Sequence, residues 1–502
     1  MSCKFPSRVP WLLLLALGLS FVGFLSGHSP QKPFGFSPIK KSTNGAGDHC
    51  FCDLKGKVDD CDCSVDHVDG LNNAKIYPML RSLMAKDYFR FFKVNLRKPC
   101  PFWPDDDRCS MHACAVSPCS EDQIPEGIKS NRTPDASPRP IVSIANTSAF
   151  NIIYGPELPP KSSSGSCDNK EDLGTLNTTI SESASKGIAK WTAHDQEQDS
   201  FCEPDDLDGE GAVYVDLLLN PERYTGYSGP SAHRIWRAIY EENCFKPKRG
   251  YGPYIDSTNV GDLCLEKRVF YRAVSGLHTS INIHLCAEYL HLQEGAQLLG
   301  PSSGIWAPNV DEFRKRFDPA LTSGEGPQRL RNLYFLYLVE LRALAKAAPY
   351  LLEEPFYTGR EEEDKEVRMA VRQFLRNVQD FGPHFNESSM FSDGNKQAKK
   401  LKEEFQHHFR NISRIMDCVG CEKCKVWGKL QIQGLGTALK ILFSGDFARD
   451  DPLSFDLKSM RKSRFRLQRN EIVALFNAFA RLSDSIYELE NFKMTTSAES
   501  WE

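Results

Sequence analysis

The chain has no excess of positive charge. Its 62 Lys and Arg residues are slightly outnumbered by 66 Asp and Glu residues, which gives a formal net charge of −4. Proteins that bind the phosphate backbone of nucleic acid are generally basic, so this balance excludes a general nucleic-acid binder. Hydrophobic residues make up 40% and charged residues 25% of the chain, which excludes a wholly disordered or fibrous protein. At about 100–200 residues per domain, the 502 residues allow two to four domains or one large one.

Long hydrophobic runs are almost absent. The one such run, residues 11–25, follows Lys4 and Arg8 and precedes small residues. It is shorter than the roughly 20 apolar residues that cross a bilayer, so we predict a cleaved secretory signal peptide over residues 1–27 rather than a membrane anchor. The final residues, SAESWE, lack a KDEL-type retrieval signal, so retention in the endoplasmic reticulum would need another mechanism.

A secretory start implies an oxidising compartment, in which cysteines form disulfides. Sequons of the N-x-S/T type support this interpretation, and we predict glycosylation at Asn146, Asn177, Asn386 and Asn411. We interpret the basic stretch 458–469 as a solvated loop, with contact to anionic lipid or to an acidic partner as the alternative.

Internal repeats, runs of alternating strands and a dinucleotide-binding fingerprint are also lacking. The stretch GLGTAL at 434–439 begins G-x-G but has Leu439 where the third glycine belongs, so we reject it as a nucleotide-binding loop. Apolar residues recur instead every three to four positions. This periodicity predicts helices over residues 267–290, 331–351, 396–418 and 470–492, the last of them capped by Asn470.

The predicted fold class is therefore mainly α, with one large helical domain and a cysteine-rich, disulfide-bonded N-terminal region. Composition divides the chain into successive segments. These are the signal peptide at 1–27, a flexible leader at 28–49, a cysteine-rich region at 50–125, a Ser/Pro-rich loop at 126–190 and a helical body at 191–495.

The 17 cysteines are unusually many, and most fall into three clusters. The first cluster holds Cys50, Cys52, Cys61 and Cys63, whose symmetric spacing suits a hairpin with nested bridges, Cys50–Cys63 and Cys52–Cys61. The spacing alone permits three connectivities and also a zinc knuckle. In an oxidising compartment we favour structural disulfides.

The second cluster holds Cys100, Cys109, Cys114 and Cys119. Three aspartates just upstream keep the Cys109-x4-Cys114 pair polar and exposed, and exposed, loosely held disulfides tend to be the labile ones. The pair is therefore a candidate redox-active disulfide, with an ordinary structural bridge as the alternative.

The third cluster, CVGCEKC, holds Cys418, Cys421 and Cys424. The Cys421-x2-Cys424 spacing is typical of redox dithiols, and Lys423 and Lys425 favour a thiolate. Iron–sulfur proteins also use C-x2-C-x2-C, but the fourth cysteine and the proline of their pattern are missing here, so we favour a dithiol and predict no metal. The odd cysteine needs an outside partner, and Cys100 is a candidate for Cys418. That bridge would bring the second cluster toward the third.

A dithiol relay needs a final electron acceptor. Cysteines do not pass two electrons to oxygen at a useful rate, whereas a flavin does. Four blocks of the chain then point to one family: YFRFFKVNLRKPCPFW (88–103), YVDLLLNPERYTGY (214–227), NLYFLYLVELRAL (332–344) and NISRIMDCVGCEKCKVWGKLQIQGLGTALKILFS (411–444). They closely resemble the endoplasmic reticulum oxidoreductins, flavin-dependent thiol oxidases that supply disulfides to protein disulfide isomerase. The likeness runs from about Cys50 to Phe492. INIHLCAEYL, with Cys286, is more similar to the vertebrate beta form than to the alpha form.

The resemblance implies a single, largely helical domain that holds FAD non-covalently. It carries FAD contacts over to Arg223, Thr225, Trp236, Ser275, His278, Arg316 and Arg329. These residue types suit the task, because arginines bind a pyrophosphate through forked donors and an indole ring stacks on an aromatic ring. Ser275 and His278 are three residues apart on a predicted helix and so share a face.

The resemblance also implies redox roles for four cysteines. Cys109–Cys114 would be the outer shuttle disulfide, which accepts electrons from the reduced isomerase. Cys421–Cys424 would be the inner disulfide beside the flavin, with Cys424 as the thiol that meets it.

Further cysteines match structural and regulatory positions. The structural bridges implied are Cys100–Cys418 and Cys244–Cys264. Cys119 and Cys167 match regulatory cysteines: in the inactive state Cys109 would pair with Cys167, and Cys114 with Cys119. Cys202 and Cys286 have no assigned partner.

The implied partners are protein disulfide isomerase, related thioredoxin-fold proteins and molecular oxygen, with hydrogen peroxide as the product. We expect a mostly monomeric protein of the endoplasmic reticulum lumen, with peripheral membrane contact and no nucleic acid. The rival hypotheses are a non-enzymatic, disulfide-rich binding protein, a metal-binding cysteine protein, and a family member that has lost activity.

Overall fold

The computed structural model describes residues 51–52, 61–62, 65–103, 114–129, 200–203, 205, 207–227, 230–244, 264–292, 304–380, 385, 387–391, 396–444 and 466–499. Several features predicted above lie outside these residues: the signal peptide 1–27, the leader 28–49, most of the loop 126–190, Cys50, Cys63, Cys109, Cys167, Asn146, Asn177 and Asn386. Of the basic stretch 458–469, only residues 466–469 are described.

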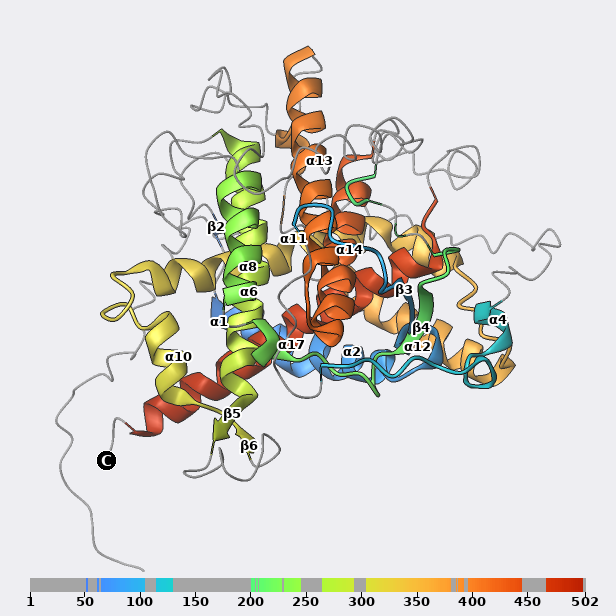
Figure 1. Ribbon diagram of the computed structural model, residues 1–502, viewed down its shortest axis with the longest axis horizontal. Coiled ribbons are helices and arrows are strands. Elements are labelled where there is room, and N and C mark those ends of the chain that lie inside the picture. The colour runs from blue at the N-terminus through green and yellow to red at the C-terminus, as the bar shows by residue number, and fades with distance from the viewer. Residues whose placement is uncertain are drawn as a thin grey trace, which may run out of the picture.

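Helices dominate the described chain, as the apolar periodicity predicted (Figure 1). The long helices are α8 (Leu265–Ala287), α11 (Glu325–Glu353), α12 (Glu361–Asp380), α13 (Lys396–Ile415), α14 (Glu422–Phe443) and α17 (Arg469–Glu499). Shorter helices and helical turns are α1 (Val65–Leu71), η1 (Asn72–Ile76), α2 (Tyr77–Met84), α3 (Asp87–Arg90), η2 (Glu121–Gln123), α4 (Glu126–Lys129), η5 (Tyr224–Tyr227), α6 (Pro230–Arg237), η6 (Ala238–Asn243), α10 (Val310–Phe317), η7 (Glu387–Ser389) and η8 (Met416–Cys418). The four helices predicted by residue range correspond to α8, α11, α13 with η8, and α17.

Strands are few and short among the described residues. They form three antiparallel pairs: β1 (Phe51–Cys52) with β2 (Cys61–Asp62), β3 (Phe91–Asn95) with β4 (Ala212–Asp216), and β5 (Tyr289–Leu292) with β6 (Gly304–Ala307). In the first pair Cys52 lies opposite Cys61, which is the register that nested bridges require. The bridges Cys52–Cys61 and Cys50–Cys63 themselves stay predictions. The β3–β4 pair is too short to show as an alternating run in the sequence.

The core forms where α17 crosses the bundle. In Figure 1 this helix, drawn in red, passes the upright α8 and α14, and it packs against both of them as well as against α11 and α2. A Cβ atom at Gly434 of α14 would lie 2.4 Å from the backbone oxygen of Ala474 in α17. The glycines of GLGTAL therefore let two helices approach closely, which is a packing role and not nucleotide binding.

The predicted disulfide between Cys100 and Cys418 is present. It joins residues that are 318 positions apart in the sequence, with their Cα atoms 4.4 Å apart. The bridge joins the first cysteine of the second cluster to the first cysteine of the third, so it brings the two clusters into one region of the molecule.

The predicted Cys244–Cys264 bridge is wrong. Cys244 is a thiol that is 1% exposed and packs within the hydrophobic core, whereas Cys264 forms a disulfide with a different cysteine. Burial raises the pKa of the Cys244 thiol. Enclosed in this way, Cys244 acts as a small apolar side chain.

Two asparagines also depart from expectation. Asn470 does not cap α17, because its side-chain Nδ2 donates to the backbone oxygen of Lys93 in β3 at 2.7 Å. Asn411 is 1% exposed within α13, and its Oδ1 accepts a hydrogen bond from Arg414 at 3.2 Å. A side chain enclosed in this way leaves no room for a glycan, so the structure contradicts the predicted glycosylation of Asn411.

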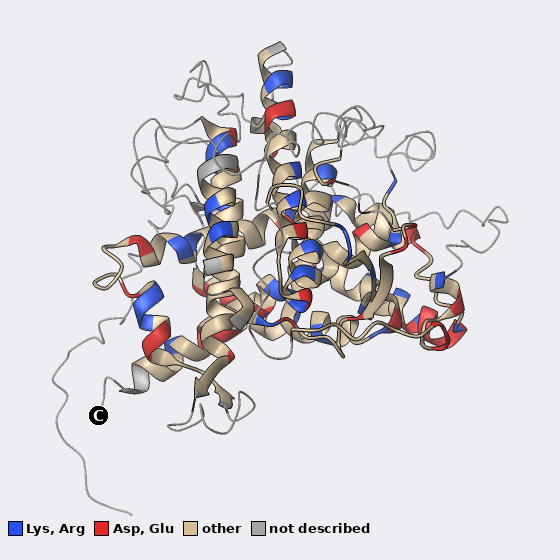
Figure 2. Cartoon of the chain, in the orientation of Figure 1, with Lys and Arg blue, Asp and Glu red and all other residues tan. Residues whose placement is uncertain are grey.

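Charged side chains of both signs are interspersed along the helices (Figure 2), with a concentration of acidic residues near α4 and the first turn of α12. Across the described residues, no helix has both the length and the apolar composition needed to traverse a bilayer.

Candidate active site

Cys421 and Cys424 form a disulfide at the N-terminus of α14. Cys421 precedes the first helical residue, and its Sγ accepts a hydrogen bond from the backbone N–H of Cys424 at 3.4 Å. Both side chains are buried. Because the N-terminus of a helix stabilises negative charge, this position favours a thiolate once the disulfide is reduced.

Cys114 approaches this inner disulfide from a distant part of the sequence. The sulfur atoms of Cys114, Cys421 and Cys424 all lie within 4.8 Å of one another. The backbone N–H of Lys423 donates to the carbonyl oxygen of Cys114 at 2.9 Å and holds the two segments together. The structure thus unites one cysteine of the second cluster with two of the third, whereas Cys109 lies outside the described residues.

Two cations border the three sulfurs. Burial and the nearby guanidinium of Arg223 lower the pKa of Lys423, while Cys114 opposes that shift. The guanidinium of Arg223 also lies over the ring of Trp306, 5.1 Å from its centroid. Positive charge near a cysteine stabilises its thiolate relative to its thiol.

The turn η5 lies directly over the inner disulfide. A Cβ atom at Gly226 would fall 2.2 Å from Cys424 Sγ, so only glycine fits there. The carbonyl oxygen of Arg223 is 3.3 Å from the same sulfur. This sulfur has no proton to donate while it is in the disulfide, but the carbonyl is an acceptor for the Cys424 thiol after reduction.

A buried ion pair anchors this turn to α17. The side chains of Glu222 and Arg481 are 2% and 4% exposed, and Arg481 Nε lies 3.0 Å from Glu222 Oε2. The hydroxyl of Tyr227 donates to Glu222 Oε1 at 2.7 Å, and its oxygen lies 3.3 Å from the carbonyl oxygen of Cys424. The backbone of η5 beside the disulfide is therefore held in place by the charge of Arg481 in α17.

The residues predicted to hold FAD fall into two groups. Arg223 and Thr225 belong to the segment over the inner disulfide. Farther along, the ring of Trp236 in α6 stacks on the ring of His278 in α8, with centroids 3.8 Å apart. Ser275 does not join this pair, because its hydroxyl accepts a hydrogen bond from Asn332 of α11 at 3.0 Å.

Arg316 and Arg329 lie beside the stacked rings. Arg329 Nη1 donates to the carbonyl oxygen of Arg316 at 3.2 Å. Burial and the positive charges of these two arginines lower the pKa of His278 to about 3, so its ring is neutral at pH 7. Each arginine also pairs with a glutamate of its own helix, Arg316 with Glu312 and Arg329 with Glu325.

Three further cysteines discussed above, Cys119, Cys202 and Cys286, are thiols that lie away from the inner disulfide. Cys119 packs against Phe91 and Ile128, and burial and the charge of Asp216 raise its pKa. The Cys202 thiol donates to the carbonyl oxygen of Ile432, and burial raises its pKa. Burial likewise raises the pKa of Cys286 to about 12. These thiols are poorly ionised at pH 7, which makes them slow nucleophiles.

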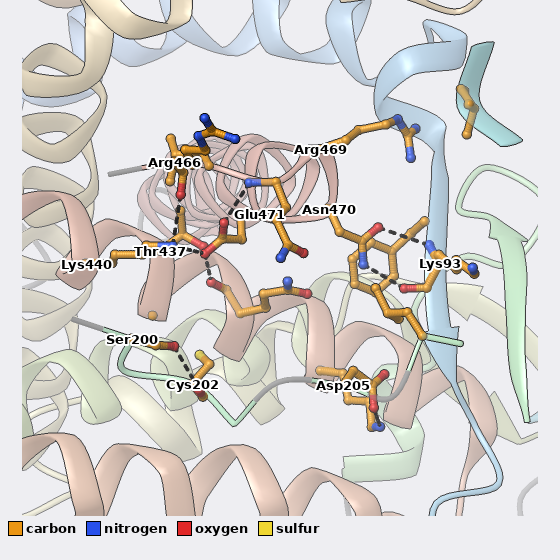
Figure 3. Close-up of a pocket in the computed structure, with 18 of the residues that line it drawn as sticks. Lys93, Ser200, Cys202, Asp205, Thr437, Lys440, Arg466, Arg469, Asn470 and Glu471 are labelled. Carbon is orange, nitrogen blue, oxygen red and sulfur yellow. Dashed lines mark hydrogen bonds and ion pairs between the residues drawn. The ribbon is translucent and has the colours of Figure 1, made fainter. Parts of the chain in front are cut away.

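A large cavity of 1240 Å³ lies elsewhere, between β3, the C-terminal half of α14 and the start of α17 (Figure 3). Among the residues that the structure describes, no redox cysteine and no predicted FAD contact lines this cavity. Its charged groups pair across the walls, as Lys440 does with Glu471 at 2.9 Å and Lys429 with Asp205 at 2.9 Å. The cavity is therefore separate from the candidate active site.

Sequence reasoning missed the residues that hold the site in shape. Asn220, Glu222 and Gly226 lie in the block 214–227, in which only Arg223 and Thr225 are predicted to have a role. Glu422 lies between the two cysteines of the CxxC motif. Arg481 had a usable signal, because it is a lone cation in an otherwise apolar stretch of α17 and such a residue is rarely buried without a partner.

Comparison with known proteins gives the same assignment throughout. Residues 75–489 match the family model Endoplasmic Reticulum Oxidoreductin 1. The chain is 52% identical over 454 residues to the Ero1-like protein of Drosophila melanogaster, covering 89% of this chain and 90% of that protein. It is 47% identical over 483 residues to the human ERO1-like protein alpha, covering 93% and 94%.

A solved structure, that of a double cysteine-to-alanine mutant of S. cerevisiae Ero1p, is similar with a TM-score of 0.54 and 28% identity, over 87% of this chain and 99% of that one. The predicted helical fold class is confirmed. Since the family model spans most of the chain and the curated relatives share about half of its residues, the chain belongs to the endoplasmic reticulum oxidoreductin 1 family, a family of oxidoreductases.

Proposed function

We propose that this protein is a thiol oxidase of the endoplasmic reticulum lumen that reoxidises protein disulfide isomerase. Electrons would enter at Cys109–Cys114, pass to Cys421–Cys424 and then to FAD, and reach molecular oxygen with hydrogen peroxide as the product. The observation that carries the proposal is the meeting of Cys114 with the inner disulfide, all three sulfurs lying within 4.8 Å of one another. A related structure is titled Ero1p, source of disulfide bonds for oxidative protein folding in the cell, which supports the same role.

Transfer between the two pairs is a thiol–disulfide exchange. The thiolate of Cys114 attacks the sulfur of Cys421, so that a Cys114–Cys421 bond forms, the Cys421–Cys424 bond breaks and Cys424 leaves as a thiolate. The thiolate of Cys109 then attacks Cys114, which restores the outer disulfide and releases Cys421. The outer pair has lost two electrons and the inner pair has gained them. Lys423, Arg223 and the N-terminus of α14 stabilise the thiolates formed on the way.

The residues present suit FAD. Trp236 offers an aromatic surface, Arg316 and Arg329 offer guanidinium groups for a pyrophosphate, and the Nε of Arg223 is buried without a hydrogen-bond partner. When bound, FAD would take two electrons from the inner dithiol and pass them to oxygen. Arg316 and Arg329 would have to exchange their glutamate partners for the anionic group.

Regulation through Cys119 and Cys167 stays part of the proposal. A Cys114–Cys119 disulfide would draw Cys114 away from the inner disulfide, because Cys119 packs in a separate apolar cluster. The high pKa of the Cys119 thiol predicts that this bridge forms slowly.

The absorption spectrum of the purified chain, with oxygen uptake after reduced isomerase is added, tests the function. We expect a flavin band and oxygen consumption. Cys114→Ala should abolish uptake driven by the isomerase, while uptake driven by dithiothreitol, a small thiol, should persist as long as the inner site is intact. A colourless protein after refolding with FAD would favour a binding protein, and stoichiometric metal would favour the metal hypothesis. Bound flavin without oxygen uptake would mark an inactive family member.

A further inference from the structure

The segment that carries Cys114 is bonded on both sides to the inner site. On one side, the backbone N–H of Lys423 donates to the carbonyl of Cys114 at 2.9 Å, and the N–H of Val116 donates to the Oε2 atom of Glu422 at 2.8 Å. The donor to Cys114 (Lys423) and the acceptor from Val116 (Glu422) therefore both belong to the first turn of α14, and the N-terminus of this helix carries the inner disulfide.

On the other side, Asn220 forms a two-way contact with Ser117. The N–H of Ser117 donates to Asn220 Oδ1 at 2.8 Å, and Asn220 Nδ2 donates to the Ser117 carbonyl at 3.0 Å. A side-chain amide thus supplies both bonds that a neighbouring strand would have supplied. Asn220 is 1% exposed and its own carbonyl accepts from the indole N–H of Trp427 in α14, so the clamp is fixed to the same helix.

Between Cys114 and Ser117, the Lys423 bond joins backbone to backbone, whereas the bonds at Val116 and Ser117 use side chains. Backbone pairing with β4 begins only at Pro118, which lies opposite Val215. A shuttle cysteine has to reach the inner disulfide and then leave it to meet a partner protein. A strand paired along its whole length would resist such release. One backbone bond from Lys423 and the side-chain contacts of Glu422 and Asn220 orient the segment and are few enough to break together.

We propose that Glu422 and Asn220 are positioning residues that hold the Val116–Ser117 backbone so that Cys114 stays within reach of the Cys421–Cys424 disulfide. The inference rests on the proposed relay and adds to it the residues that set how often the shuttle occupies its electron-delivering position. Neither residue touches a reacting sulfur in this assignment; each acts through the backbone that carries Cys114.

The test measures how strongly the fold favours a Cys114–Cys421 bond. In the full chain with Cys109→Ala, Cys119→Ala, Cys167→Ala and Cys424→Ala, the thiols of Cys114 and Cys421 are equilibrated with glutathione. Two protein thiols and one glutathione disulfide give one protein disulfide and two glutathione thiols, so the position of equilibrium reports the effective concentration of Cys114 at Cys421. The bond is quantified by peptide mapping after acid quenching.

Adding Glu422→Ala should lower this equilibrium constant about 3–10-fold, the range expected for one typical lost hydrogen bond. Glu422→Gln keeps an acceptor oxygen and should recover most of the loss. Asn220→Asp, which cannot donate to the Ser117 carbonyl, should lower the constant by a similar factor. Glu361→Ala is the matched control, because Glu361 is likewise an exposed glutamate at the first position of a long helix but lies on α12.

Equal constants for Glu422→Ala and Glu361→Ala, with unchanged circular dichroism, would overturn the inference. So would a loss in Glu422→Gln as large as that in Glu422→Ala, since a lost charge and not a lost acceptor would then be responsible. The measurement needs neither flavin nor isomerase, so its failure is distinguishable from failure of the proposed oxidase function. In the otherwise unaltered chain, Glu422→Ala should lower kcat with the isomerase and leave KM nearly unchanged.

Discussion

At the scale of single residues, the inner disulfide depends on a neighbouring residue that has no side chain. Gly226 is the clearest case, because the place of its missing Cβ is taken by Cys424 Sγ. The same logic applies at Gly436, where a Cβ would lie 2.1 Å from Cys202 Sγ. At both positions the sulfur occupies the space that a side chain on the glycine would take.

Gly226→Ala should therefore displace η5 from the disulfide. We expect the chain to fold but to oxidise thiols about 10–100-fold more slowly, because a shift of about 1 Å at a reacting group can cost that much. The rate of oxygen uptake with dithiothreitol measures it. Gly70→Ala in α1 is the control, since a Cβ there meets nothing within 4 Å and should leave the rate unchanged. Equal rates for the two variants would contradict the account.

At the scale of elements, the site is held from behind by α17. This helix packs on α14, which carries the inner disulfide. Its Arg481 also forms an ion pair with Glu222, which precedes η5 in the chain. Two segments far apart in sequence are thereby fixed against one helix. Both partners of the ion pair are buried, so removing one of them leaves the other charge in the core without a counter-ion.

Arg481→Leu should destabilise the protein by about 3–5 kcal/mol, because it leaves the Glu222 carboxylate buried without its cation. The double variant Glu222→Met with Arg481→Leu should recover most of that loss, since no unpaired charge remains. Urea unfolding midpoints measure both. A double variant no more stable than Arg481→Leu would show that the ion pair is not the source of the effect.

At the scale of the whole molecule, one disulfide ties the N-terminal cysteine region to the helical body. Cys100–Cys418 spans 318 positions of sequence, and the chain that follows Cys100 leads to Cys114 at the inner site. A cross-link over so long a loop restricts the unfolded chain more than the folded one.

Cys100→Ala with Cys418→Ala should lower the free energy of unfolding by up to roughly 5–6 kcal/mol in the chain-entropy model. It should also weaken delivery of electrons to the inner disulfide, because the shuttle region loses its covalent tether. Thermal unfolding without reductant measures the first effect. Cys119→Ala, which removes a half-buried thiol and no cross-link, should cost about 1 kcal/mol. If Cys119→Ala lost as much free energy of unfolding as the Cys100→Ala, Cys418→Ala double variant, the cross-link would not be the source of the stabilisation.

Much of this molecule followed from the order of its residues alone. Apolar spacing predicted α8, α11, α13 and α17, because a helix that buries one face must repeat an apolar residue every three to four positions. Cysteine spacing singled out Cys421–Cys424 and pointed to Cys100 as the partner of Cys418. The same spacing could not exclude the Cys244–Cys264 bridge, which came from resemblance alone and is wrong.

What only the tertiary structure decided is which distant residues meet. Cys114, Asn220 and Glu422 carry no shared spacing, and Glu222 and Arg481 lie on segments that no local pattern connects. Asn411 reads as a glycosylation site in sequence and is buried in the fold. Local patterns report the helix or turn that a segment forms with its own neighbours. The contacts that hold the inner disulfide arise when the whole core closes, and the sequence alone does not place them.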